Sequence, residues 1–172
     1  MKALNSSSLP SDYNSRNAFT ALIAAFIFHN IEEAVSICSY PIQSPVSFIK
    51  PVSCSQFLWA VSLITLVVII AFTIAVRSNK SAFYLFISTA VSAGLLINAL
   101  IPHVFIAIYT LNYTPGLVTA LLLNLPLSLI VLTKNCKQYA TKSQFFKQII
   151  IGLIVGYLIL ALIMGAVLNF VV

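Results

Sequence analysis

Five long apolar runs separated by short polar segments constrain the fold of this chain more than any other feature. They cover about residues 17–38, 56–76, 81–109, 115–133 and 148–170 of 172. An α-helix of about 20 apolar residues crosses the ~30 Å hydrocarbon core of a bilayer. Only 7% of the residues are charged, against about 25% in soluble domains. We therefore predict an all-α, multi-pass membrane bundle of about five transmembrane helices, in one domain covering residues 1–172.

The distribution of basic residues predicts the orientation of this bundle. With five spans, the polar N-terminal lead (residues 1–16) and two of the connections lie on the same side of the membrane. Basic residues favour the cytoplasmic side, so we expect a cytoplasmic N-terminus, an external C-terminus and a location in the cell membrane. The basic residues are scattered at span ends, which excludes a nucleic-acid surface. The cytoplasmic set is Lys2, Arg16, Arg77, Lys80, Lys134, Lys137, Lys142 and Lys147, and Lys50 lies on the other side.

The first apolar run is expected to stay in the protein as a span. It continues through Glu32 and Glu33, and no small-residue cleavage site follows it, so it differs from a signal peptide. Cys38 and Cys54 bracket the next polar loop on the outer side, where a disulfide is chemically permitted. The sequence leaves that pairing open and predicts a free Cys136.

Prolines predict irregular backbone in two of the spans. Pro102 lies inside the third span and removes the hydrogen bond to the carbonyl of Asn98. Thr114 and Pro115 are typical of an N-cap and a first helical position, so we expect the fourth helix to begin there. Pro126 interrupts the same helix further along.

The segment His29-Asn30-Ile31-Glu32-Glu33 carries two of the three acidic residues of the chain and lies within the first apolar run. In a helix, residues at i, i+3 and i+4 share one face, so His29, Glu32 and Glu33 are neighbours. A charge in hydrocarbon costs from about 2.5 to more than 10 kcal/mol. Such residues pair or bind a ligand, so we predict a functional site here.

Other polar residues reach the same depth of the bilayer. Counting ~1.5 Å per residue from the inner ends of the spans, Glu32 lies about 22 Å along the first helix and Asn98 about 25 Å along the third. His103 lies just beyond Asn98, and Asn124 lies about 14 Å from the outer end of the fourth helix. All of them are expected in one layer of the outer half of the membrane.

Imidazole and carboxylate groups projecting into a helical bundle suit zinc, iron or manganese. The leading hypothesis is a metal-dependent membrane enzyme, a hydrolase or oxidase, that acts on a lipid or another hydrophobic small molecule. If it hydrolyses, one Glu would activate water and Asn98 would orient the substrate. The predicted ligands are His29, Glu32, Glu33 and His103, the predicted catalytic groups are Glu32, Glu33 and His103, and the predicted substrate contacts are Asn30, Asn98 and Asn124.

Two alternatives use the same residues without a metal. In a metal-free isomerase, one Glu would be the protonated acid and its neighbour the ionised base, with a His carrying protons. The protein could also be a proton-coupled transporter or a binding protein for a small solute. The cluster would then couple proton movement to transport or gate the solute pathway. Five spans without an internal repeat argue mildly against transport, although a homo-oligomer could supply a second half.

At His29-Asn30-Ile31-Glu32-Glu33 the chain resembles the HXXEE-motif family of small multispanning membrane proteins. The resemblance implies that His29, Glu32 and Glu33 form the shared polar site, and it supplies no mechanism because the function of the family is undetermined. The chain also bears a looser architectural likeness to the emopamil-binding sterol isomerases, five-span proteins that use His and Glu for proton transfer. No contiguous motif carries that second likeness.

Overall fold

The computed structural model describes residues 9–39 and 52–171, and this part of the chain is helical without any strand. Five helical segments are long and apolar enough to cross a membrane: Ser15–Ser36, Cys54–Arg77, Ser81–Thr110, Leu117–Cys136 and Lys142–Phe170. This confirms the predicted all-α bundle of five spans. The helical elements are α1 (Leu9–Ser36), α2 (Cys54–Arg77), α3 (Ser81–Asn98), η1 (Ala99–Phe105), α4 (Ile106–Thr110), α5 (Leu117–Thr119), η2 (Ala120–Asn124), α6 (Leu125–Cys136) and α7 (Lys142–Phe170).

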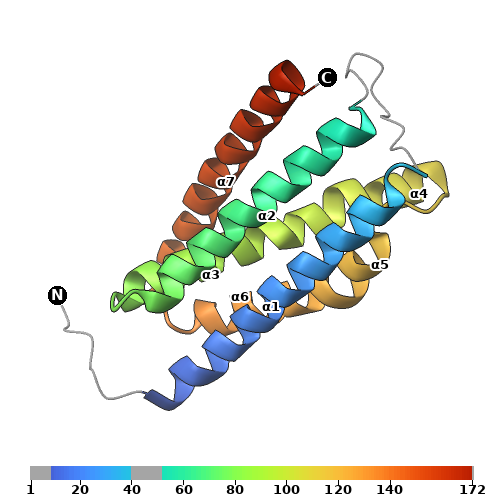
Figure 1. The fold of residues 1–172 in the computed structure, drawn as a ribbon. Coiled ribbons are helices and arrows are strands. Elements are labelled where there is room, and N and C mark those ends of the chain that lie inside the picture. Colours follow the sequence, from blue (N-terminus) through green and yellow to red (C-terminus); the bar gives the residue numbers. More distant parts are fainter. Residues whose placement is uncertain (1–8, 40–51, 172) are drawn as a thin grey trace.

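The helix α3 lies at the centre of the bundle and packs against α2, α6 and α7, while α1 packs against α2 and α6 (Figure 1). The main apolar core joins α1, α2, α3 and α6, and in it the ring of Phe19 makes T-shaped contacts with Phe72 and Tyr84. The helix α7 is largely exposed. It approaches α3 closely at Gly152, where an added Cβ would lie 2.4 Å from the Cβ of Ala90.

Local capping explains where several helices begin. Ser53 and Gln56 form a capping box at the start of α2, and Thr141 accepts a hydrogen bond from the backbone N–H of Gln144 at the start of α7. Both pairs satisfy amide groups that the first turn leaves unpaired. The helix α1 begins at Leu9, earlier than the predicted span, and Pro10 suits a first turn because it has no amide hydrogen to lose.

The chain between α3 and α6 is less regular than the sequence predicts. Around Pro102 the helix widens into the π-helix η1, and α4 then ends at Leu111 in a left-handed conformation. The predicted N-cap at Thr114 is wrong: the next helix begins after Gly116, whose φ is 81°. The reversal of the chain needs this positive φ, which glycine adopts without strain. Thr114 instead donates to the carbonyl of His103.

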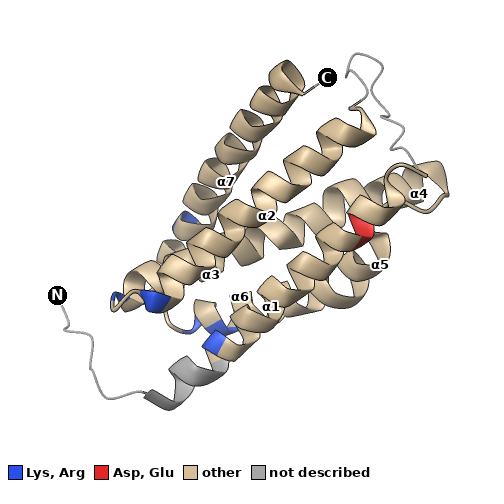
Figure 2. Ribbon diagram, in the orientation of Figure 1, with Lys and Arg blue, Asp and Glu red and all other residues tan. Residues whose placement is uncertain are grey.

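Charged residues separate to opposite ends of the bundle (Figure 2). The described basic residues gather at the end that holds the α2–α3 and α6–α7 turns, and the two described glutamates lie towards the other end of α1. Lys2 and Lys50 lie outside the described residues. This separation is what the positive-inside rule requires, while the orientation of the termini in a membrane stays a prediction.

A buried polar cluster, here called the Asn135 cluster, joins α1, α3 and α6 near the basic end. Ser15 Oγ donates to Asn135 Oδ1 at 3.1 Å. Asn135 Nδ2 donates to Ser88 Oγ at 2.8 Å and to Thr89 Oγ1 at 3.1 Å, and the Tyr139 hydroxyl also donates to Thr89 Oγ1. Both polar atoms of the Asn135 side-chain amide are therefore paired with neutral partners.

At the opposite end, Cys38 and Cys54 form a disulfide that ties the end of α1 to the first residue of α2, with Cα atoms 5.4 Å apart. This resolves the pairing that the sequence left open. Cys136, at the end of α6, is a free thiol, as predicted.

Candidate metal centre

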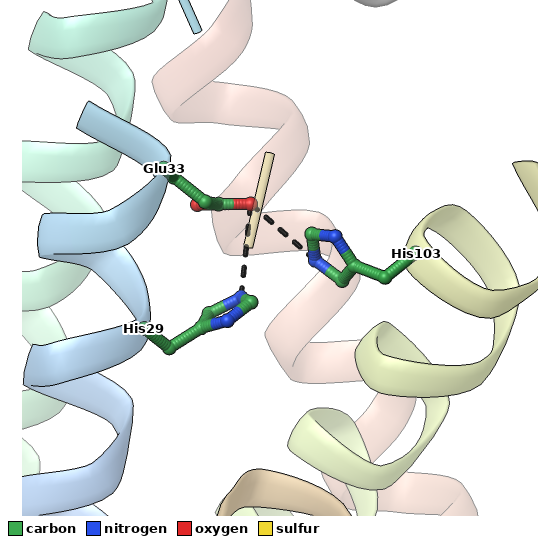
Figure 3. Close-up of side chains that lie close together, drawn as sticks. All are labelled: His29, Glu33 and His103. Atoms are coloured by element: carbon green, nitrogen blue, oxygen red, sulfur yellow. Dashed lines mark ion pairs between the residues drawn. The ribbon is translucent and has the colours of Figure 1, made fainter. Parts of the chain in front are cut away.

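Three side chains from two segments of the chain converge on one point (Figure 3). His29 and Glu33 lie one turn apart on α1, and His103 comes from η1. Glu33 Oε1 lies 3.7 Å from His29 Nε2 and 3.4 Å from His103 Nε2. All three possible ligand atoms lie within 4.8 Å of one another. Both imidazoles are almost fully buried, so this is an interior site.

The spacing of these atoms suits a metal ion. Zinc bonds to His nitrogen at ~2.0–2.1 Å and to carboxylate oxygen at ~2.0–2.2 Å. Two ligands of a tetrahedral ion at those bond lengths lie roughly 3.3–3.5 Å apart, close to both distances from Glu33 Oε1. Two His and one carboxylate also form the ligand set of non-haem iron sites that keep open positions.

A hydrogen bond on the outer side of the His29 ring sets which of its nitrogens faces the centre. Thr119 Oγ1 donates to Glu32 Oε2 at 2.6 Å, so in its 3.0 Å bond with His29 Nδ1 the ring nitrogen is the donor. On His103, Nε2 lies 3.4 Å from the amide nitrogen of Asn98, which is a donor. In both imidazoles Nε2 therefore faces the centre, where the Asn98 amide adjoins it.

Gly116 lies directly against the three converging side chains. A Cβ added at this position would lie 2.7 Å from His29 Cε1, 2.8 Å from Glu33 Cγ and 2.9 Å from His103 Cε1. No real side chain tolerates contacts this short, and the φ of 81° also favours glycine. The loop can cover the three side chains only because residue 116 is a glycine.

The structure holds Glu32 apart from the three converging side chains. Its Oε1 accepts hydrogen bonds from the Tyr113 hydroxyl at 2.6 Å and from the amide of Val118 at 3.3 Å. Its Oε2 accepts the amide and the hydroxyl of Thr119, at 2.9 and 2.6 Å. Glu32 thus binds the first amide groups of α5 and, through Thr119, holds the ring of His29.

The three asparagines predicted to contact substrate occupy different surroundings. Asn98 Nδ2 lies 3.4 Å from Nε2 of both His29 and His103, so Asn98 adjoins the centre. Asn30 donates to Thr65 Oγ1 and joins α1 to α2. Asn124 is fully buried, and neither polar atom of its side chain has a hydrogen-bonding partner among the described residues.

An elongated apolar cavity of about 880 Å³ opens beside the centre, between α1, α2, α3 and α7. Along α2 its wall runs from Cys54 to Ala71, roughly 25 Å at ~1.5 Å per residue. Glu33, Asn98 and Asn30 contribute polar groups to a lining that is otherwise mostly hydrophobic. The carboxylate of Glu33 therefore faces both the imidazoles and the cavity.

Three residues around the centre were not found from the sequence: Gly116, Thr119 and Tyr113. The dipeptide Pro115-Gly116 is a turn signal, but nothing in the sequence says that this turn covers a site. Hydroxyl residues such as Thr119 and Tyr113 are common near span ends. Their contacts with Glu32 arise only because the loop folds back over α1.

Comparisons with known proteins identify the family of the chain. Residues 20–131 match the family described as "Protein of unknown function with HXXEE motif". The chain is 33% identical over 140 residues to the uncharacterized protein YrkK of Bacillus subtilis (strain 168). The aligned residues cover 81% of this chain and 86% of that protein. No solved structure matches the chain. The match over most of its length shows that the chain belongs to the HXXEE-motif family.

Proposed function

We propose that this member of the HXXEE-motif family is a metal-dependent membrane enzyme that acts on a lipid or another hydrophobic small molecule. One observation carries the proposal: His29, Glu33 and His103 direct three acceptor atoms at one point beside a long apolar cavity. We also propose the cell membrane as its location, with the basic end of the bundle on the cytoplasmic side.

The directions of the side chains favour a cation. His29 donates its Nδ1–H outward to Thr119, which leaves Nε2 free to face the centre. Nε2 of both rings faces the carboxylate of Glu33, and a cation bound among these electron-rich atoms would be favoured over their mutual repulsion. Zinc, iron or manganese fits the donor set, and such an ion would supply Lewis-acid or redox chemistry.

The cavity favours a hydrophobic substrate with one polar group. One acyl chain occupies about half of the ~30 Å hydrocarbon core, so a wall of roughly 25 Å accommodates it. The polar group of the substrate would lie at Glu33 and Asn98, the side chains that border both the cavity and the centre. There, the amide of Asn98 would orient the reacting group by a hydrogen bond.

This proposal is tested with purified protein in vesicles of mixed lipids, followed by mass spectrometry of the lipids over time. Turnover of a lipid class that stops with a chelator and returns with zinc, iron or manganese is the expected result, with no turnover in Glu33→Gln. Asn112→Ala, in the exposed loop after α4, is the matched control. Turnover that persists without metal would overturn the metal-dependent reaction in favour of metal-free acid/base chemistry. Solute uptake without lipid turnover would favour a transporter.

A further inference from the structure

Buried polar atoms between α3 and α6 lack partners. Ser92 Oγ on α3, Ser128 Oγ on α6 and both polar atoms of Asn124 form no hydrogen bond with any described residue, and all three side chains are fully buried. An unpaired buried polar atom is unfavourable, because it has lost its hydrogen bonds to water without gaining others. Proteins pair such atoms with protein groups or with buried water, which typically makes about three hydrogen bonds. These atoms therefore call for a polar ligand in this interface.

The Asn135 cluster fixes how α3 and α6 lie against each other. The two helices are antiparallel (Figure 1), and Asn135 on α6 donates to Ser88 on α3. Ser128 and Asn124 precede Asn135 by about two and three helical turns, so they share its face. Ser92 follows Ser88 by about one turn, so it lies on the matching face of α3. The three unpaired side chains therefore continue the polar row that the Asn135 cluster begins.

The spacing of this row suits single water molecules. At ~1.5 Å per residue, Ser92, Ser128 and Asn124 lie about 6, 10 and 16 Å from the Asn135 cluster along the bundle. Asn124 is then level with Asn98, whose amide adjoins both imidazoles. Successive steps of about 4–6 Å match the reach of one water that makes two hydrogen bonds of ~2.8 Å.

We propose that Ser92, Ser128 and Asn124 bind a file of buried water molecules that joins the His29–Glu33–His103 centre to the Asn135 cluster at the basic end of the bundle. The large cavity is apolar and suits a hydrophobic substrate. The polar row would give water and protons a path, separate from this cavity, between the centre and the Asn135 cluster. This inference holds for any reaction at the centre that consumes water or moves a proton, with or without a metal.

The test is solid-state nuclear magnetic resonance of the full chain in lipid bilayers, with ¹⁵N-labelled asparagine. Magnetisation that starts on water should reach the side-chain amide of Asn124 as readily as that of Asn112 in the exposed loop. Replacing both hydroxyls (Ser92→Ala with Ser128→Ala) should reduce this transfer severalfold. Ser62→Ala is the matched control and should leave it unchanged, because the Ser62 hydroxyl donates to the carbonyl of Leu58 in its own helix.

Absence of transfer to Asn124 in the unmodified protein, with strong transfer to Asn112, would overturn the water file. That result needs no variant, so a folding defect cannot obscure it. Metal analysis of the same samples keeps this inference separate from the proposed enzyme. A hydrated but metal-free protein would retain the water file and reject the metal-dependent function, and a dry, metal-loaded protein would do the reverse.

Discussion

Two buried polar clusters in the described part of the bundle differ in how their donors and acceptors balance. In the Asn135 cluster every amide atom meets a neutral partner of the opposite kind. In the centre formed by His29, Glu33 and His103, the carboxylate of Glu33 faces Nε2 of both rings, and one amide nitrogen, from Asn98, adjoins the same two atoms. A balanced cluster needs nothing further and joins helices. We propose that the second cluster binds a cation, so that the same membrane interior would contain a structural cluster and a binding site.

Removing one predicted metal ligand should distinguish the roles of the two clusters most clearly. Added zinc should raise the unfolding temperature of the unmodified protein, because a ligand at ~100 times its Kd stabilises by about 2.7 kcal/mol. His103→Ala should lose this stabilisation entirely. Thermal unfolding in detergent, with and without metal, measures the effect. An equal metal-induced shift in His103→Ala would mean that the ion binds elsewhere.

Adding a side chain at residue 116, which lies against His29, Glu33 and His103, should reduce metal binding almost as much as removing a ligand. Gly116→Ala places a methyl group within 2.9 Å of all three ligand side chains and adds backbone strain of about 1 kcal/mol or more at a positive φ. We expect loss of metal together with a lower unfolding temperature. Gly94→Ala is the control, because an added Cβ there meets nothing within 4 Å. If Gly116→Ala bound metal normally, the loop would not cover the centre as described.

Weakening the support of His29 should reduce metal affinity without abolishing it. Glu32→Gln and Thr119→Val each break the chain of hydrogen bonds that orients the ring. Loss of such a supporting bond typically costs 10–100-fold in affinity. Competition titration with a chelating dye measures this change. The double variant should be little weaker than either single variant, and fully additive losses would contradict a shared role.

Disrupting the balanced cluster should affect stability alone. Asn135→Ala leaves the hydroxyls of Ser15, Ser88 and Thr89 without their amide partner. The expected loss is about 1–2 kcal/mol of unfolding free energy, with unchanged metal content in the folded protein. Equilibrium unfolding followed by circular dichroism gives the first quantity, and elemental analysis gives the second. Loss of metal in folded Asn135→Ala would remove the distinction between the clusters.

The smallest effect on metal binding is expected from Tyr113, at the exposed edge of the site. Tyr113→Phe removes one of the four hydrogen bonds to Glu32 and should weaken metal binding only a few-fold, since one neutral bond contributes about 0.5–1.5 kcal/mol. Burial, together with the bond to Glu32, raises the pKa of Tyr113 above its ordinary value of 10.0. A raised pKa means that the neutral hydroxyl is favoured in the fold. The contact between Tyr113 and Glu32 therefore persists at neutral pH. It is lost as the pH rises through the raised pKa of Tyr113.

The sequence predicts the bundle well and the site in part. Hydropathy alone identifies the five spans, because a bilayer demands long apolar helices. Helical spacing predicts that His29 and Glu33 are neighbours, and counting along the spans brings His103 to their depth. The same spacing cannot tell that Glu32, about 100° around α1 from Glu33, meets a returning loop instead of the centre. That outcome depends on the π-helical stretch at Pro102 and on Gly116, which no periodicity reveals.

The most direct test of the unbalanced centre is its metal content. Inductively coupled plasma mass spectrometry should be applied to the full chain purified without chelators, beside a His29→Ala, Glu33→Ala double variant of proven helical content. About one zinc, iron or manganese ion per chain in the unmodified protein and none in the double variant is the expected result. No metal in the folded, unmodified protein, or equal metal in both proteins, would contradict it.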